Sequence, residues 1–233
     1  MEEERLCGER MVNHTQYSAA NLFAEAHVDP EKWNRLPPDS EVAKTVEAIA
    51  QRGIAVLRAR NSKIALDTLK DLIPPKAKVM HGSSTTLVEI GYEAYVNSDD
   101  SQWNDLHRAI VAENDDEKRR ALRRKSVTAD YFVSGVNAIA QSGEILACDR
   151  SGSRVGAWPY AAAHLILVSG TNKLAPTLDD ALSRVWEYAY PLENVRAERA
   201  YGVPSQIGKC VILANEEIEG RATLILIDES LGY

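Results

Sequence analysis

Short apolar runs alternate with amphipathic segments between residues 53 and 80. Residues 54–57 form an apolar run of strand length, and residues 77–80 form a second one. Between them, Asn61 is placed to cap a segment with leucine and isoleucine at helical spacing, and Pro74 ends that segment. A strand, a helix and a strand at this spacing predict parallel strands joined by a right-handed crossover.

The second half of the chain continues this alternation. Residues 138–140 and 144–148 predict two strands around a tight turn, for which Gly143 can supply a positive φ. Residues 164–168 are apolar almost throughout, which is typical of a strand buried on both faces. Thr177 is placed to cap a long helix.

The last two apolar runs, residues 210–213 and 222–227, are separated by a polar segment, and we expect them to pair as a short C-terminal hairpin. The whole pattern predicts an α/β fold with a mostly parallel sheet flanked by helices. Prolines punctuate the start of the chain. We therefore expect residues 1–36 to form an N-terminal arm and residues 37–233 to form a single domain, opened by a helix that Ser40 caps.

The composition is that of a globular protein with an acidic balance: 233 residues, 45% hydrophobic, with a net charge of -7. Such a chain is a poor candidate for nucleic-acid binding, which needs many phosphate contacts. Its basic run, residues 118–125, follows acidic residues and is typical of a solvated helix with ion pairs. No stretch approaches the roughly 20 apolar residues that span a bilayer, and the acidic start does not resemble a secretion signal. We expect a cytoplasmic protein that binds neither nucleic acid nor membrane.

The three cysteines, Cys7, Cys148 and Cys210, lie far apart in the sequence and form no Cys-x-x-Cys pair. This pattern argues against an iron–sulfur site, a zinc ribbon or a disulfide framework, and it suits a reducing compartment. The histidines outside the apolar runs, among them His107, show no metal-ligand spacing. We therefore expect no metal site and no cofactor.

Polar residues at the predicted strand ends are the candidates for chemistry, because ligands collect at the carboxyl edge of a parallel sheet. His81 can transfer protons near neutral pH, and Gly82 permits a close approach of the backbone to a ligand. Ser83, Ser84 and Thr85 can hold a phosphate or carboxylate with their hydroxyls and amides. The same residues could equally form a Ser/Thr helix cap after a tight turn.

A second candidate lies in residues 149–156, where a carboxylate, glycines and guanidinium groups fall close together. Arg154 suits bidentate recognition of a carboxylate or phosphate, and Asp149 could act as a general base or hold that arginine. The alternative is an Asp–Arg pair that braces the loop; we favour the functional interpretation. Asn137 could orient a substrate carbonyl or tie down its own turn.

Three further side chains are open to two interpretations. Lys173 follows the apolar strand and could bind an anion or be an exposed lysine. Glu144, at the predicted turn, could be a second acid or base or an exposed turn residue. His164, at the edge of the apolar strand, is expected to be a hydrogen-bonded structural histidine.

Several motifs together resemble one family. Residues 82–91 look like a Gly-x-Ser-x-Thr-Leu-x-Glu-x-Gly segment that includes Glu89, and Asp149-x-x-Gly152-x-Arg154-Val155 is similar to an Asp-Gly-x-Gly-Asn-Arg-Val element. The residues Gly170-x-Asn172-Lys173-x-x-Pro176 and the closing Leu231-Gly232-Tyr233 match further elements. In order and spacing, the chain from about residue 45 to residue 233 resembles the LUD-domain (lactate-utilization) family. The resemblance adds Glu89, Gly152 and Asn172 to the candidate substrate-binding residues.

The resemblance implies the fold shared by ribose-phosphate isomerases, CoA transferases and folate cyclo-ligases, and a role in handling lactate-like small acids. Many small bacterial relatives carry a cysteine cluster before the last strands, but residues 199–209 contain none here. Ser153 and Gly156 also replace the Asn and Ala that are usual in the family. These departures argue against a direct redox role and suggest an altered substrate.

Two functions are consistent with these observations. The first is an enzyme that binds a small anionic or carbonyl metabolite and transforms it by acid/base chemistry, without a redox cofactor of its own. The second is a non-catalytic subunit of a lactate-oxidising assembly, which binds substrate or a partner protein. The first predicts a possible homo-oligomer that is active alone, and the second predicts an oxidoreductase partner.

Overall fold

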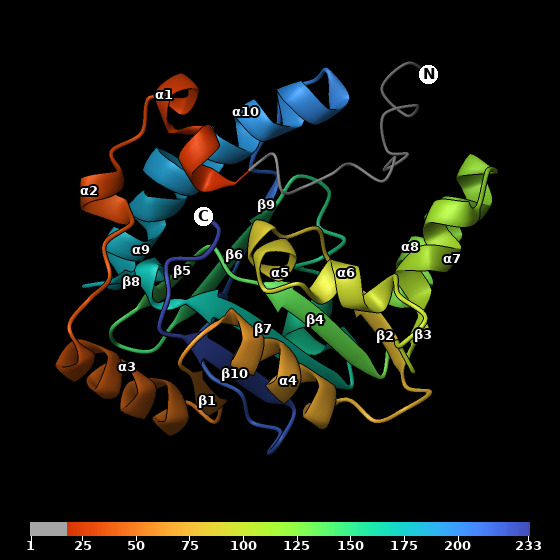
Figure 1. The fold of residues 1–233 in the computed structure, drawn as a ribbon, viewed down its shortest axis with the longest axis horizontal. Helices are drawn as coiled ribbons and strands as arrows, with labels where there is room; N and C mark the ends of the chain where they lie inside the picture. Colours follow the sequence, from red (N-terminus) through yellow and green to blue (C-terminus); the bar gives the residue numbers. More distant parts are fainter. Residues whose placement is uncertain (1–17) are drawn as a thin grey trace.

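Six strands form one parallel sheet in the computed structural model, which describes residues 18–233 (Figure 1). Their order across the sheet is β1-β10-β7-β4-β2-β3. The strands are β1 (Ala55–Ala59), β2 (Lys78–His81), β3 (Asn104–Asp105), β4 (Tyr131–Gly135), β7 (His164–Gly170) and β10 (Ala222–Ile227). Because every neighbouring pair is parallel, the carboxyl ends of all six strands lie at the same edge. The α/β architecture predicted from the sequence is confirmed.

A second, four-stranded sheet packs against the first in the order β8-β5-β6-β9. Its strands are β5 (Ala138–Ala140), β6 (Ile145–Asp149), β8 (Leu174–Ala175) and β9 (Lys209–Leu213). Strands β5 and β6 are antiparallel and are joined by the predicted tight turn, where Gly143 has a φ of 100°. Cβ of any other residue at this position would also lie 2.8 Å from the Ala48 carbonyl, so the turn requires glycine in two ways.

The predicted C-terminal hairpin is wrong. Strand β9 pairs antiparallel with β6 in the second sheet, whereas β10 lies between β1 and β7 in the main sheet and is parallel to both. The side chains of β10 explain its position: Leu224 and Leu226 enter the core on one face of the sheet, and Ile225 and Ile227 enter the core on the other. A strand that is apolar on both faces fits the centre of a parallel sheet better than a hairpin.

Helices cover both sheets (Figure 1). The α-helices are α1 (Phe23–Ala26), α2 (Pro30–Trp33), α3 (Asp39–Gln51), α4 (Ser62–Leu72), α5 (Thr85–Glu89), α6 (Tyr92–Val96), α7 (Leu106–Ala112), α8 (Asp116–Ser126), α9 (Leu178–Arg184) and α10 (Tyr190–Tyr201). Short helical segments are η3 (Ala19–Asn21), η4 (Ala157–Ala161), η5 (Thr171–Lys173) and η6 (Val185–Ala189). Within residues 18–233, no helix is both long enough and apolar enough to cross a membrane.

Two of the three predicted helix caps are present. The Asn61 side chain accepts a hydrogen bond from the Ile64 amide at 3.0 Å, and the Thr177 hydroxyl accepts one from the Asp180 amide at 3.1 Å. Ser40 is not a cap, because α3 begins one residue earlier and follows Pro38 without a side-chain cap. The proline sets the extended backbone from which that helix starts.

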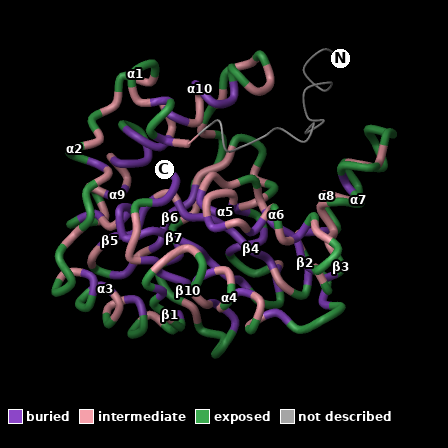
Figure 2. The backbone as a smooth tube through the Cα atoms, viewed as in Figure 1, coloured by how far each residue is buried: buried purple, intermediate pink, exposed green. Residues whose placement is uncertain are grey.

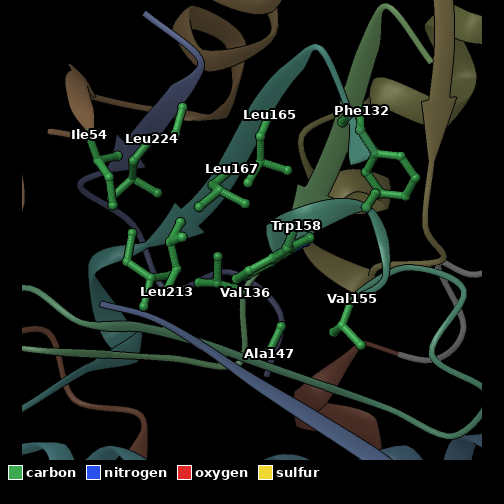
Figure 3. Close-up of a cluster of buried hydrophobic side chains, with 14 of the residues drawn as sticks. Ile54, Phe132, Val136, Ala147, Val155, Trp158, Leu165, Leu167, Leu213 and Leu224 are labelled. Atoms are coloured by element: carbon green, nitrogen blue, oxygen red, sulfur yellow. The ribbon is translucent and has the colours of Figure 1, made fainter. Parts of the chain in front are cut away.

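The largest core cluster lies between the two sheets (Figure 3). Leu165 and Leu167 of β7 and Leu224 of β10 face Ala147 of β6 and Leu213 of β9 in this layer. A second cluster lies on the other face of the main sheet, under α4, α5 and α6. A third joins the outer face of the second sheet to α9 and η6. The main sheet is therefore packed against apolar side chains on both of its faces.

The described part of the N-terminal arm packs on the body of the protein. Leu22 and Trp33 are buried against Leu192 and Val195 of α10, and α1 lies beside that helix (Figure 1). Residues 1–17 of the predicted arm, which include Cys7, lie outside the described residues.

Candidate functional site

A cavity of about 300 Å³ lies at the carboxyl ends of β2 and β4. Its walls come from His81 and the residues that follow β2, from Gly135 to Asn137 after β4, and from the loop that follows β6. Helices α7 and α8 close one side, and α10 with the segment after it closes another. This is the position at which open parallel sheets usually bind ligands.

Two histidines face each other at one end of the cavity. The His81 ring is buried, and its centroid lies 4.4 Å from that of His107 and 5.2 Å from that of Tyr92. His107 is held at the start of α7, where its amide donates to the Asp105 carboxylate at 2.9 Å. Burial raises the pKa of that carboxyl. The sequence offered no signal for this pairing, because His107 belongs to a charged, helical stretch.

The segment after β2 combines a close backbone approach with a helix cap. A Cβ on Gly82 would lie 2.5 Å from Cδ of Arg154, so only glycine lets the arginine pack here. Ser84 caps α5 by accepting from the Leu87 amide at 3.4 Å, as the alternative interpretation expected. Ser83, Ser84 and Thr85 all line the cavity, so a ligand can reach their hydroxyls as well.

Asp149 and Arg154 form a closed hydrogen-bonded unit at the base of their loop. Arg154 Nε donates to Asp149 Oδ1 at 2.8 Å, and the other carboxylate oxygen accepts from the amides of Arg154 and Val155. Nη1 of Arg154 donates to the Gly135 carbonyl at 2.7 Å, and Nη2 donates to the Cys148 carbonyl at 2.8 Å. These bonds match the bracing alternative, and both side chains also line the cavity.

The Asn137 side chain connects three segments by hydrogen bonds, so its role is not limited to its own turn. Its Oδ1 accepts from the Cys148 amide at 2.9 Å and from Arg154 Nη2 at 3.1 Å. The residue lines the cavity and is half-buried. It therefore connects the end of β4 to β6 and to the arginine loop.

Lys173 is fully buried, so the exposed-lysine interpretation is wrong. Its Nζ donates to Thr86 Oγ1 at 2.8 Å, to the Val136 carbonyl at 2.9 Å and to the Tyr233 carbonyl at 3.2 Å. These three bonds use all three hydrogens of an ammonium group. Burial lowers the pKa of Lys173 well below its ordinary value, and the nearby Arg184 charge lowers it further.

The motif residues Glu89 and Asn172 hold the last residues of the chain, together with Lys173. The Gly232 amide donates to the Glu89 carboxylate at 2.7 Å, and the Leu231 amide donates to Asn172 Oδ1 at 3.1 Å. Glu89 and Asn172 do not themselves line the cavity, but Tyr233 does. Residues 231–233 are buried (Figure 2). These motif residues thus position a wall of the cavity.

Glu144 and Gly152 lie outside the cavity lining. Glu144 forms an ion pair with Arg52 and accepts from the Ser142 hydroxyl, at the opposite end of β6 from Asp149. The Cα atoms of these two residues are five positions apart along extended chain, or about 16 Å. Gly152 has a φ of 90° and shapes the loop beneath Arg154. His164 is exposed and stacks on Tyr131, with ring centroids 4.7 Å apart.

Helix α10 contributes to the cavity lining an arginine that was not predicted from the sequence. Arg196 of α10 is 5% exposed, and its Nε and Nη2 each donate to the Glu193 carboxylate at 2.7 Å. The Tyr233 hydroxyl donates to the same carboxylate at 2.9 Å. The remaining nitrogen, Nη1, is buried and has no hydrogen-bond partner within residues 18–233. An arginine at a single helical position resembles any surface arginine, so its role cannot be predicted from the sequence.

The lining of the cavity is cationic although the protein is acidic. Five cationic side chains line it, against two carboxylates: Arg123, Arg150, Arg154, Lys173 and Arg196 against Asp149 and Glu193. Both carboxylates are already paired with arginines. No three His, Cys, Asp or Glu side chains among the described residues are grouped as metal ligands would be.

The fold and the cavity define an α/β protein whose candidate ligand site lies at the carboxyl edge of a parallel sheet. The sequence profile of the LUD domain matches residues 42–209. The chain therefore belongs to the LUD-domain family.

The chain has only remote similarity to two solved structures. A DUF162 family protein from Deinococcus radiodurans is 11% identical, with a TM-score of 0.48, and the match covers 83% of this chain and 99% of that chain. The delta subunit of eIF2B from Chaetomium thermophilum is 13% identical, with a TM-score of 0.28, and the match covers 62% of this chain and 54% of that chain. No curated protein matches the chain.

Proposed function

We propose that this protein binds a small anionic or carbonyl metabolite, such as a hydroxy or keto acid, in the cavity and transforms it by acid/base chemistry. The observation that carries the proposal is the cationic lining, in which five basic side chains outnumber two carboxylates that are already paired with arginines. Arg196 Nη1 is also buried without a hydrogen-bond partner among the described residues, which costs free energy. An anion that binds beside Arg196 and reaches this nitrogen would supply the acceptor.

The side chains divide into binding, proton-transfer and positioning roles. Arg196, Arg123 and Arg150 attract and bind the anion, and the Ser83 hydroxyl, which also lines the cavity, donates to it. His81 exchanges a proton with the substrate, because imidazole titrates near neutral pH and this ring is at the cavity end. His107 lies against it and steadies the ring.

The remaining predicted residues act indirectly, because they hold the walls of the cavity in place. Asp149, Arg154 and Asn137 hold the loop after β6 against the end of β4. Lys173 holds the C-terminal segment that carries Tyr233 into the cavity. In this proposal they are positioning residues, and the reacting groups are His81 and the bound substrate.

The proposal is tested first by a thermal-shift screen against hydroxy acids, keto acids, sugar phosphates and acyl-CoA compounds. A compound that binds the native state raises the melting temperature by mass action. We expect at least one anionic class to raise it in the wild-type protein and to do so less in Arg123→Ala. Arg124→Ala removes the same charge from an exposed neighbour on α8 and is the matched control. A screen without any shift, or equal shifts in all three proteins, contradicts the proposal.

The catalytic part is tested separately with His81→Asn. This variant keeps a polar side chain of similar size but cannot exchange a proton. We expect turnover of the identified ligand to fall by about 10²-fold or more, while the ligand still raises the melting temperature. Full turnover in this variant excludes His81 as the proton-transfer group.

A further inference from the structure

Two cysteines that are far apart in the sequence, Cys148 and Cys210, lie opposite each other in the second sheet. They are register partners in the antiparallel pair β6–β9. The Cys148 amide donates to Asn137 and its carbonyl accepts from Arg154, so both groups point away from β9. The two cysteines therefore form a non-hydrogen-bonded pair, in which Cα atoms lie about 4.5 Å apart. This separation falls within the range of disulfides, about 4.4–6.8 Å.

The two sulfur atoms already face each other. Their separation is 2.6 Å, so a bond between them requires no movement of the strands. Both thiols are free in this structure. Cys210 is exposed, and Cys148 is half-buried and lines the cavity. One sulfur is thus open to a reagent in solution, and the other lies behind it.

The environment makes the two thiols chemically different. The hydrogen bond from Cys148 lowers the pKa of Cys210 to about 7, while that interaction, together with burial, raises the pKa of Cys148. The thiolate is the nucleophile in thiol–disulfide exchange. Cys210 is therefore the thiol that reacts first, and Cys148 is the one that closes the bond.

We propose that Cys148 and Cys210 are a reversible redox pair that closes to an intrachain disulfide by exchange with a low-molecular-weight disulfide such as oxidised glutathione. The Cys210 thiolate attacks one sulfur of the glutathione disulfide, whose S–S bond breaks and releases one glutathione. Cys148 then loses its proton and attacks the Cys210 sulfur, which releases the second glutathione. Two protein thiols are oxidised, and one glutathione disulfide is reduced to two thiols.

The bridge would act on the wall of the cavity. Strand β9 is the edge of the second sheet, and the segment that leads into it contributes Val203, Ser205 and Ile207 to the lining. A Cys148–Cys210 bond would fasten that segment to β6 beside Arg154. Amide hydrogen exchange over residues 203–213 is accordingly expected to slow in the oxidised protein. The inference does not depend on the proposed function, because it needs no ligand and no turnover.

The test uses the full chain with Cys7→Ser, which leaves only the two cysteines of the pair. After incubation with oxidised glutathione, we expect loss of both alkylatable thiols and one non-reduced peptide pair that joins Cys148 to Cys210. Dithiothreitol should restore both thiols. Alkylation of both cysteines after that incubation, or a bond between two chains, would overturn the proposal.

Two single-cysteine variants test the order of the steps. With Cys7→Ser and Cys148→Ser, Cys210 should accumulate a stable mixed disulfide with glutathione, because the resolving thiol is missing. With Cys7→Ser and Cys210→Ser, Cys148 should react at least about tenfold more slowly, because Cys148 is half-buried whereas Cys210 is exposed. Equal rates at the two positions contradict the assigned order. The bridge assay itself uses the unaltered pair, so a folding defect in a serine variant does not affect it.

Discussion

At the scale of single residues, this protein uses buried cations mainly as structural connectors. Arg154 and Lys173 donate their hydrogens to carbonyls and side chains of several segments, and Arg221 does the same around η4. A guanidinium suits this work because its fork of donors can bond several acceptors at once. The sequence singled out Arg154 and Lys173, but their partners lie up to 87 residues away in the chain and could not be inferred from spacing.

Arg154→Lys tests the bracing role of the guanidinium. Lysine keeps the charge but cannot reach Asp149, Gly135 and Cys148 together, and the Asp149 carboxylate loses its planar partner. We expect a loss of about 3 kcal/mol in the free energy of unfolding, or about 6–12 °C in Tm. Arg150→Lys, in the exposed part of the same loop, should change Tm by less than about 2 °C. Similar decreases in Tm for the two variants would show that Arg154 does not stabilise the loop.

Lys173 predicts a specific pH dependence of stability. Its pKa in the folded protein is lowered by burial, whereas in the unfolded chain it is about 10.4. Between these values the unfolded chain holds a proton that the folded chain lacks, so the contribution of Lys173 to stability rises with pH. Urea unfolding at several pH values should therefore show that the stability difference, wild type minus Lys173→Met, grows as the pH rises toward about 10.4. A difference that stays flat or falls as the pH rises contradicts the lowered pKa.

At the scale of elements, local patterns predicted the parts of the fold that local chemistry determines. The crossover from β1 through α4 to β2, the turn between β5 and β6 and the cap of α9 all follow from propensity and turn residues. The positions of β9 and β10 in the two sheets do not follow from local patterns. Whether two successive strands pair with each other depends on the other strands in the fold. Here β9 pairs with β6, and β10 pairs with β7.

The β5–β6 turn allows a matched test of glycine. Gly143 and Gly220 both have positive φ, but a Cβ on Gly143 would meet the Ala48 carbonyl, whereas a Cβ on Gly220 would meet nothing within 4 Å. Gly220→Ala should cost only the backbone strain, about 1 kcal/mol, and Gly143→Ala should cost about 3 kcal/mol. Chemical denaturation measures both. Equal losses would mean that the contact with α3 does not constrain the turn.

At the scale of the whole molecule, an acidic protein encloses a cationic cavity. The net charge is -7, yet cationic side chains outnumber carboxylates in the lining. The sequence indicated the half of the site that follows β2 and β6, because strand ends with glycine, serine and paired charges are recognisable locally. It could not indicate the other half, since His107, Arg196 and Tyr233 reach the cavity from distant helices and from the C-terminal segment.

The assembly state distinguishes the proposed enzyme from the alternative, a subunit of an oxidoreductase assembly. The purified chain should turn over its ligand alone, and mass measurement should give one species of fixed stoichiometry. Turnover that appears only after addition of an iron–sulfur or flavin protein would favour the subunit.

The proposed function requires that the cationic lining binds a small anion. The most direct measurement is calorimetric titration of the strongest ligand from the screen into the wild-type protein and into Arg123→Ala, Arg196→Lys and Arg124→Ala. We predict a Kd at least about tenfold weaker in the first two variants, which corresponds to the loss of one charged hydrogen bond, and a Kd within about twofold of wild type in Arg124→Ala. A Kd that is the same in all four proteins would contradict the account.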